Sequence, residues 1–218
     1  MEKRESLWKA SLDSNKTLGE VNDDKVEAIL KGYESSIATT ESSILAIREL
    51  KQSLSKTTIK SLNDFLNFYL FINMFQLDIS VVLHRYLLSK LPYELVYFGK
   101  SSALLVFEYL NSIHFVFNKF VKTSPAILQP DIESIKIFLK QIAKIKKNHP
   151  QLKLIRNMIT AHRHHNSFEY LKITSEIESY EYIKLISTVM KVNTSLSITV
   201  VSSLKKIDEV FKKHLTKK

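Results

Sequence analysis

The chain has 218 residues, and its 44% hydrophobic content is enough to fill one core. Three glycines and four prolines are too few for the turns of a sandwich, a barrel or a βαβ array, and the absence of cysteine excludes disulfides, thiolate zinc sites and cysteine nucleophiles. The formal net charge of +10 favours an anionic partner but does not by itself choose among nucleic acid, an acidic protein and a membrane surface.

The composition therefore predicts an all-α protein, an antiparallel bundle of about five or six long helices. We expect a polar N-terminal arm or short helix over residues 1–20 and a single helical domain over residues 21–218. The lack of cysteine and of an apolar secretory signal fits a cytoplasmic location.

The first long helix is predicted from an apolar stripe with alternating steps of four and three residues. The stripe consists of Val26, Leu30, Tyr33, Ile37, Thr40, Ile44, Ile47, Lys51 and Leu54. Thr40 and Lys51 weaken it. A coiled-coil seam has the same spacing, but antiparallel packing inside a bundle is the expected cause.

A second helix is predicted from residue 57 or 58 to residue 90, with Ser61 and Asp64 as a possible capping pair. Apolar side chains on nearly every face indicate a central helix. Its most apolar window, residues 65–84, contains Asp78, which would cost roughly 3 kcal/mol at a bilayer centre. We therefore expect a buried bundle helix and no membrane partner.

Pro92 is well placed in the first turn of a third helix, which we expect to end near Val121. Pro125 and Pro130 then separate this helix from the next, because proline withholds a backbone donor and disfavours helix in the preceding residue. The following helix has an apolar face, and its opposite face carries a lysine ridge formed by Lys136, Lys140, Lys144 and Lys147.

His149 and Pro150 are predicted to end this helix and to begin another. A turn follows after Asn166, and the spacing of Ser175–Glu178 predicts a capping box for a last helix to about residue 214. The β-branched residues between positions 194 and 201 predict a bend or break in that helix.

The segment from residue 134 to residue 168 contains eight Lys or Arg and four His, and no Asp or Glu. Such a segment favours an anionic ligand. At about 100° per residue, Leu152, Ile155, Ile159 and His162 share one inward stripe, and Arg156 lies about 120° from His162 around the helix. A distorted helix end or a second subunit would therefore be needed to bring these two side chains together.

The spacing of Arg156-Asn157, four residues, and then His162-Arg163 resembles the Arg-polar-x(4–6)-His signature of the HEPN superfamily. The stretch from residue 155 to residue 163 is similar to the form found in abortive-infection-type members of phage-defence loci. The resemblance covers about residues 150–170. It implies a HEPN-like bundle that forms a homodimer, with two motifs facing each other in a basic cleft, and a metal-independent endoribonuclease activity.

The resemblance implies a role for each motif residue. His162 would act as general acid or base on the ribose 2′-OH, Arg156 would stabilise the phosphorane, and Asn157 would position the phosphate. Family members often have an acid beside the motif, and no acid lies within residues 134–168 to orient His162. The residues expected to contact RNA are Arg163, His164, His165, Lys153, Lys147 and Lys144.

Two alternatives remain open at this point. Many HEPN proteins are catalytically silent, so a noncatalytic HEPN-like module that binds RNA or a protein is the second interpretation. A metal site formed by His162, His164 and His165 is disfavoured, because steps of two and three residues spread the rings around a helix and no carboxylate is near. We expect no metal and no other cofactor, and an antitoxin or defence-system protein as a possible partner.

Overall fold

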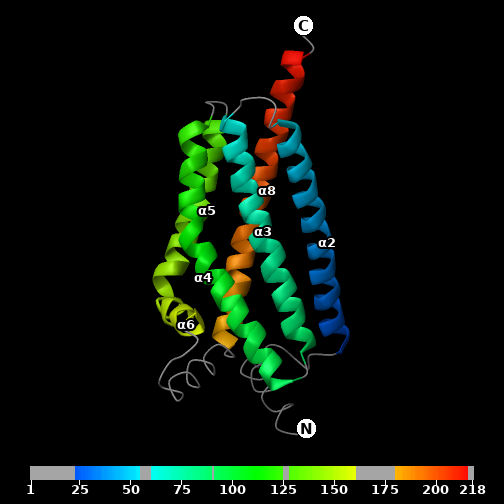
Figure 1. Ribbon diagram of the computed structural model, residues 1–218, viewed down its shortest axis with the longest axis vertical. Helices are drawn as coiled ribbons and strands as arrows, with labels where there is room; N and C mark the ends of the chain where they lie inside the picture. The colour runs from blue at the N-terminus through cyan, green and yellow to red at the C-terminus, as the bar shows by residue number, and fades with distance from the viewer. Residues whose placement is uncertain (1–22, 55–59, 90, 125–127, 161–179, 216–218) are drawn as a thin grey trace.

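The structure is a computed structural model that describes residues 23–54, 60–89, 91–124, 128–160 and 180–215. In this part of the chain there are six helices and no strand. The helices are α2 (Asp23–Leu54), α3 (Lys60–Leu88), α4 (Pro92–Thr123), α5 (Gln129–Asn148), α6 (Gln151–Thr160) and α8 (Tyr180–Leu215). They pack into one bundle, so the predicted all-α class is confirmed (Figure 1). The expected N-terminal arm, residues 1–20, lies outside the described residues.

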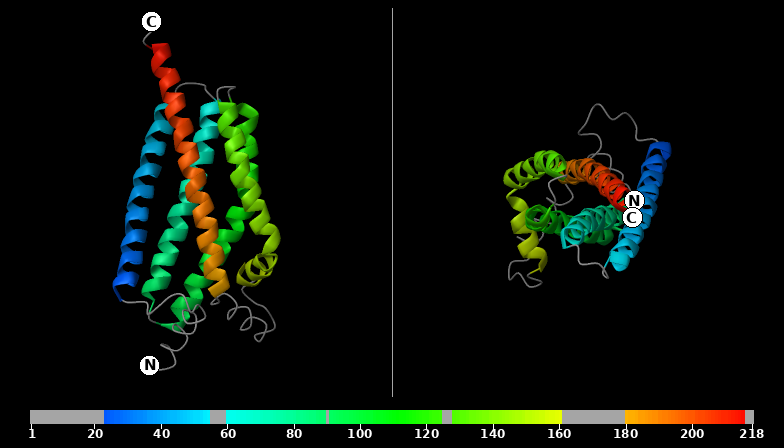
Figure 2. Two further views of the ribbon diagram at one scale, coloured as in Figure 1. Left: turned by 180° about the vertical axis from the view of Figure 1, so that it is seen from behind. Right: turned by 90° about the horizontal axis from the view of Figure 1, so that it is seen from above.

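Five of these helices run along the long axis of the molecule, and α6 lies across one end of the bundle (Figures 1 and 2). In the view from above, α3 and α4 face α5 and α8, with α2 at one edge and α6 at the other (Figure 2). The first three helices are successive neighbours, and α5 pairs with α8.

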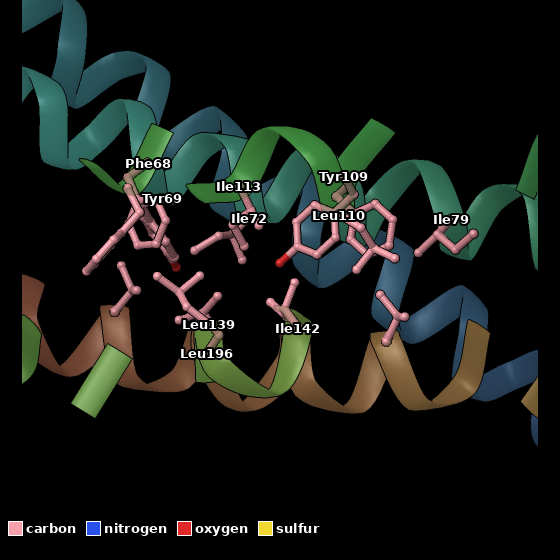
Figure 3. Packing of buried hydrophobic residues seen from close by; sticks show 14 of the residues in the cluster. Phe68, Tyr69, Ile72, Ile79, Tyr109, Leu110, Ile113, Leu139, Ile142 and Leu196 are labelled. Atoms are coloured by element: carbon pink, nitrogen blue, oxygen red, sulfur yellow. The ribbon is translucent and has the colours of Figure 1, made fainter. Parts of the chain in front are cut away.

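The core lies between these two layers. Side chains of α3 and α4, such as Ile72 and Leu110, point toward Leu139 and Ile142 of α5 and Leu196 of α8 (Figure 3). All five are at most 3% exposed. Because α3 is buried over most of its circumference, its predicted central position is confirmed.

Aromatic rings join α3 to α4 along much of their length. Phe65 meets Phe120 edge to face with ring centroids 5.2 Å apart, and Phe75 stacks on Tyr109 at 3.9 Å. Aromatic pairs of this kind contribute roughly 0.5–1.5 kcal/mol beyond the burial of their area. The rings form one continuous layer because α3 and α4 are consecutive helices that pack against each other.

A buried polar cluster connects α3, α4 and α8. Asn193 of α8 is fully buried. It accepts a hydrogen bond from the Tyr109 hydroxyl of α4 at 2.5 Å and donates to the Ile72 carbonyl at 3.3 Å and to Gln76 Oε1 at 2.9 Å on α3. The amide is thereby satisfied by two neighbouring helices, which a buried polar group requires.

The weak positions in the first apolar stripe do face the bundle. Thr40 is 7% exposed, and its hydroxyl donates to the Ser36 carbonyl at 2.7 Å, which satisfies it inside its own helix. Lys51 Nζ donates to Asn67 Oδ1 of α3 at 2.6 Å. The stripe therefore marks the face of α2 that packs on α3, as antiparallel bundle packing predicts.

The helix starts that were predicted from prolines are confirmed for α4 and α5. Pro92 occupies the first turn of α4, which ends at Thr123, and Pro130 occupies the first turn of α5. Asp64, expected as part of a capping pair, accepts a hydrogen bond from Thr123 Oγ1 of α4 at 2.9 Å. The predicted capping box at Ser175–Glu178 lies outside the described residues.

The expected bend at residues 194–201 is wrong, because α8 is one continuous helix from Tyr180 to Leu215. Leu196 and Val200 are fully buried. Burial of such side chains is worth roughly 1.5–3 kcal/mol each, which exceeds the unfavourable helix propensity of a β-branched residue such as Val200, well under 1 kcal/mol. The Thr199 hydroxyl donates to the Ser195 carbonyl at 3.1 Å within the same helix. Tertiary packing has overridden local preference here.

Two stretches, residues 62–88 of α3 and residues 184–206 of α8, are long and apolar enough to cross a membrane by length and composition alone. Half of the apolar window in α3 is buried inside the bundle. Core helices of soluble proteins meet the same criterion, so these two stretches are weak indicators in either direction.

Candidate functional site on helix α6

The motif helix begins immediately after α5 ends. The His149 N–H donates to the Lys146 carbonyl at 3.4 Å and closes the last turn of α5, and the Leu152 N–H donates to the His149 carbonyl at 3.2 Å and opens α6. Pro150 lies between the two helices and cannot continue the α5 ladder. The predicted joint at His149 and Pro150 is confirmed.

Two apolar side chains attach α6 to the bundle, where its main neighbour is α4. Leu152 and Ile155 are 3% and 2% exposed, whereas Leu154 on the other face is 50% exposed. The inward stripe is therefore confirmed for Leu152 and Ile155. The side chains of Ile159 and His162, which continue that stripe, lie outside the described residues.

Arg156 is held by two side chains of α4. Its Nε atom lies 3.6 Å from Oε1 of Glu108, and its guanidinium carbon lies 5.9 Å from the centre of the Phe107 ring. The Arg156 side chain remains 40% exposed. Because a planar guanidinium stacks on an aromatic face and pairs with a carboxylate, these contacts limit the directions in which it can point.

Asn157 is exposed beside this arginine, and its Oδ1 atom accepts a long hydrogen bond of 3.4 Å from Nη1 of Arg156. The structure thus brings two of the predicted site residues together at the surface of α6. An arginine and an amide side by side supply several N–H donors, which suits a phosphate oxygen.

Glu108 is an acid beside the motif that sequence spacing does not reveal. No acid lies near the motif along the chain, but the α4–α6 contact supplies one from a distant segment. Nothing local in the sequence marks Glu108, since an exposed glutamate on a helix is an ordinary solvent-facing residue. Its closest described partner in the motif is Arg156.

His114 of α4 is a second residue that the sequence does not single out. Burial lowers the pKa of His114, and the positive charge of Lys146 on α5 lowers it further. This imidazole is therefore neutral at neutral pH. A histidine among apolar residues carries no sequence signal that separates a functional group from a core residue.

The lysines predicted to contact RNA lie on the surface. Lys144 and Lys147 of α5 and Lys153 of α6 are exposed. The opposite side of α5 buries Ile132, Ile135, Leu139 and Ile142, whereas Ile137 is 58% exposed. The amphipathic division of α5 is thus confirmed. Within the described part of α5 and α6 the two acids are Asp131 and Glu133, both in the first turns of α5. The lysines farther along α5 and on α6 therefore have no acid near them on their own helices, and the acid described beside α6 is Glu108 of α4.

A groove opens on another side of the bundle, between α2 and α8, with α3 as its floor. Its volume is about 630 Å³, and hydroxyl and amide side chains dominate its lining, together with Lys205 and without a carboxylate. Burial raises the pKa of the Tyr69 hydroxyl at the floor, and hydrogen bonding with Asn73, Ser197 and Ser43 partly offsets this rise. No pattern in the sequence indicates this groove.

The remaining predicted site residues are His162, Arg163, His164 and His165, and all four lie outside the described residues. The distance between Arg156 and His162 therefore stays a prediction. In the described part of the chain, no group of three His, Asp or Glu side chains is arranged to hold a metal ion.

Fold and site together define an all-helical bundle that presents an Arg-Asn pair on α6, beside Glu108 of α4 and the exposed lysines of α5. No protein-family model, curated protein or solved structure matches this chain.

Proposed function

We propose that this protein is a HEPN-like endoribonuclease of the toxin or phage-defence type. It acts in the cytoplasm as a homodimer, without a metal ion or other cofactor, and an antitoxin or defence-system protein is its natural partner. The observation that carries the proposal is the Arg156 guanidinium, which α4 holds at the surface beside Asn157, at the end of a lysine-rich face.

The proposed reaction is attack of a ribose 2′-OH on the adjacent phosphorus, with departure of the 5′-oxygen. His162 accepts the 2′-OH proton or returns one to the leaving oxygen, since imidazole titrates near neutral pH. Arg156 stabilises the negative charge that builds on the phosphorane, and Asn157 positions the phosphate by hydrogen bonding. The exposed lysines Lys144 and Lys147 bind the RNA backbone.

One observation favours a second candidate, a noncatalytic HEPN-like module that binds RNA or a protein partner. Glu108 lies 3.6 Å from Arg156. A carboxylate at that distance offsets part of the positive charge that phosphorane stabilisation requires. A site of this kind retains phosphate binding and loses catalytic power.

The test is cleavage of a structured RNA in EDTA by the wild-type protein and by His162→Ala and Arg156→Ala. The nuclease proposal predicts cleavage by the wild type and a loss of at least 100-fold in each variant, roughly the usual contribution of an acid–base or charge-stabilising group. RNA binding without cleavage in all three would establish the noncatalytic module instead.

His84→Gln is the matched control for the histidine substitution. His84 lies on α3 with Nε2 3.4 Å from Glu34 of α2. Because α2 and α6 lie at opposite edges of the bundle (Figure 2), replacement of His84 should leave cleavage unchanged. Equal cleavage by the wild type and His162→Ala would remove the ribonuclease assignment from this motif. The solution mass tests the homodimer, because a strict monomer has no two-motif cleft.

A further inference from the structure

The outward face of α8 carries lysines at regular intervals. Lys184, Lys191 and Lys205 are exposed, and helical geometry places them within about 60° of one another around the axis and over about 32 Å of its length. The sequence has no Asp or Glu from Lys184 to Lys206. These three residues are called the α8 lysine strip below.

Short hydroxyl residues separate these lysines. Thr188, Ser195 and Ser202 are exposed on the same face. Each turns its hydroxyl back to a carbonyl of its own helix, at 2.8, 3.1 and 2.7 Å respectively. The lysine ammonium groups therefore project beyond their neighbours, and a charged polymer can approach the helix closely.

On one side, the strip borders α5. Lys206 Nζ lies 2.7 Å from Asp131 Oδ1. This ion pair joins the first turn of α5 to the later part of α8, as expected for two helices that run antiparallel. Asp131 thereby marks the side of α5 that faces α8. At about 100° per residue the ridge lysines Lys136, Lys140, Lys144 and Lys147 lie roughly 140–180° around α5 from Asp131, so the lysine ridge faces away from α8 and is separate from the strip.

On the other side, the strip borders the α2–α8 groove, where Lys205 is part of the lining and no carboxylate is present. The nearby acids of α2 point elsewhere. Glu34 and Glu41 lie roughly 160° around the helix from the groove-lining Ser36 and Ser43 by helical geometry, and Glu34 contacts His84 of α3. Among the side chains that the structure describes, no carboxylate therefore lies between the α8 lysine strip and the groove.

We propose that the α8 lysine strip binds the phosphate backbone of a folded RNA. This inference rests on the proposed function, because it assumes that RNA is the ligand. The span of about 32 Å matches about one helical turn of a nucleic-acid duplex. Binding by spaced lysines reads charge and shape rather than base sequence, so the substrate class is structured RNA of varied sequence.

The chemistry of this face favours RNA over two other occupants. A helix that lies on an anionic membrane presents large apolar side chains to the lipid, whereas the lysines here alternate with short hydroxyl residues and Ile198 is the large apolar side chain among them. A second copy of the same face would bring like charges together, which is unfavourable.

The test uses a hairpin RNA of about one to two duplex turns with 2′-O-methyl riboses, which cannot undergo 2′-OH attack, so binding is measured independently of cleavage. The wild type is compared with K184E/K191E/K205E and with a control, R48E/R85E/K122E. The control makes the same change in net charge at exposed positions on α2, α3 and α4. Far-UV circular dichroism verifies folding, and Lys→Gln replacements serve if charge reversal unfolds the chain.

The strip variant should bind the hairpin at least tenfold more weakly than the wild type at moderate salt. The slope of log K against log salt should fall by about 2–3, because each phosphate that a lysine no longer neutralises lowers the slope by about 0.7–0.9. The control should weaken binding less than threefold and keep the wild-type slope. Equal weakening in both variants, or none in either, would overturn the inference, as would strip-dependent binding to phosphatidylserine vesicles without strip-dependent RNA binding.

Cleavage of the unmodified hairpin separates this inference from the proposed function. Strip-dependent binding without any His162-dependent cleavage would support the proposed RNA-binding surface and contradict the proposed ribonuclease activity. Cleavage that depends on His162 and is unchanged in the strip variant would support the ribonuclease activity and contradict the proposed RNA-binding surface.

Discussion

The hydrogen bond between Tyr109 and Asn193 permits a quantitative prediction about the bundle. Burial raises the pKa of the Tyr109 hydroxyl well above its usual value, so this group is a hydrogen-bond donor at any working pH. The bond joins α4 to α8 in a region without solvent. Tyr109→Phe removes the donor and keeps the ring that stacks on Phe75, so the change isolates the hydroxyl.

Tyr109→Phe should lower the free energy of unfolding by about 1–2 kcal/mol, because a buried amide oxygen then loses a partner. Asn193→Leu should cost about 2–4 kcal/mol, since it leaves the Tyr109 hydroxyl unpaired and also removes the bonds to Ile72 and Gln76. The double variant contains no unpaired hydroxyl. Its loss of unfolding free energy should therefore be smaller than the sum of the two single losses by about 1–2 kcal/mol.

The measurement is urea denaturation followed by far-UV circular dichroism, with the denaturant slope compared among variants to check that the unfolding transition is the same. Tyr97→Phe is the matched control, because Tyr97 is 65% exposed and water replaces its hydroxyl contacts. Additivity of the two single losses within about 0.3 kcal/mol would refute direct coupling through this hydrogen bond.

Three further predictions concern the site and its surroundings. Ile155→Ala should lower the free energy of unfolding by about 2–4 kcal/mol in the same assay, and Leu154→Ala by less than about 0.5 kcal/mol, because their exposed fractions are 2% and 50%; equal losses would contradict the docking of α6. His114 has a pKa lowered by burial and then by Lys146, so its folded pKa lies below the unfolded value of about 6.5. Its contribution to stability is complete above about pH 6.5 and is lost as the pH falls through the interval down to the folded pKa; His114→Gln should flatten this decline in melts between pH 7 and pH 5, and an unchanged profile would refute the assignment. Glu108→Gln removes a half-exposed negative charge beside the motif and should strengthen RNA binding about two- to threefold, within the range of a solvent-screened pair; weaker binding would show that the carboxylate positions the arginine rather than offsetting its charge.

The long helices were predictable because their signals are local and repeated. The spacing from Leu30 to Ile47, the alternation of isoleucine and lysine in α5, and prolines at helix starts all depend on residues within a few turns of one another. The bend expected near Leu196 failed because local propensity is a weak term. Burial inside the bundle, where α8 packs mainly on α5 and α3, decides the path of α8 there.

The site was predictable only in part. The motif spacing located Arg156 and Asn157 on one short helix, and the structure brings them together at its surface. Glu108 and Phe107 could not be found in this way, because their contact with Arg156 depends on how α4 crosses α6. The position of His162 relative to Arg156 remains a prediction from helical geometry.

The attachment of α6 has a consequence for the timing of function. Its described residues, Gln151–Thr160, contact mainly α4, and most of the stability of a helix in a protein comes from the packing of its apolar face rather than from its own propensity. Its order therefore depends on Leu152 and Ile155 remaining seated against the bundle. Its backbone amides should exchange with deuterium earlier than those of α3 and α4, so the geometry of the Arg-Asn pair is governed by a local opening equilibrium that can change while the bundle stays folded.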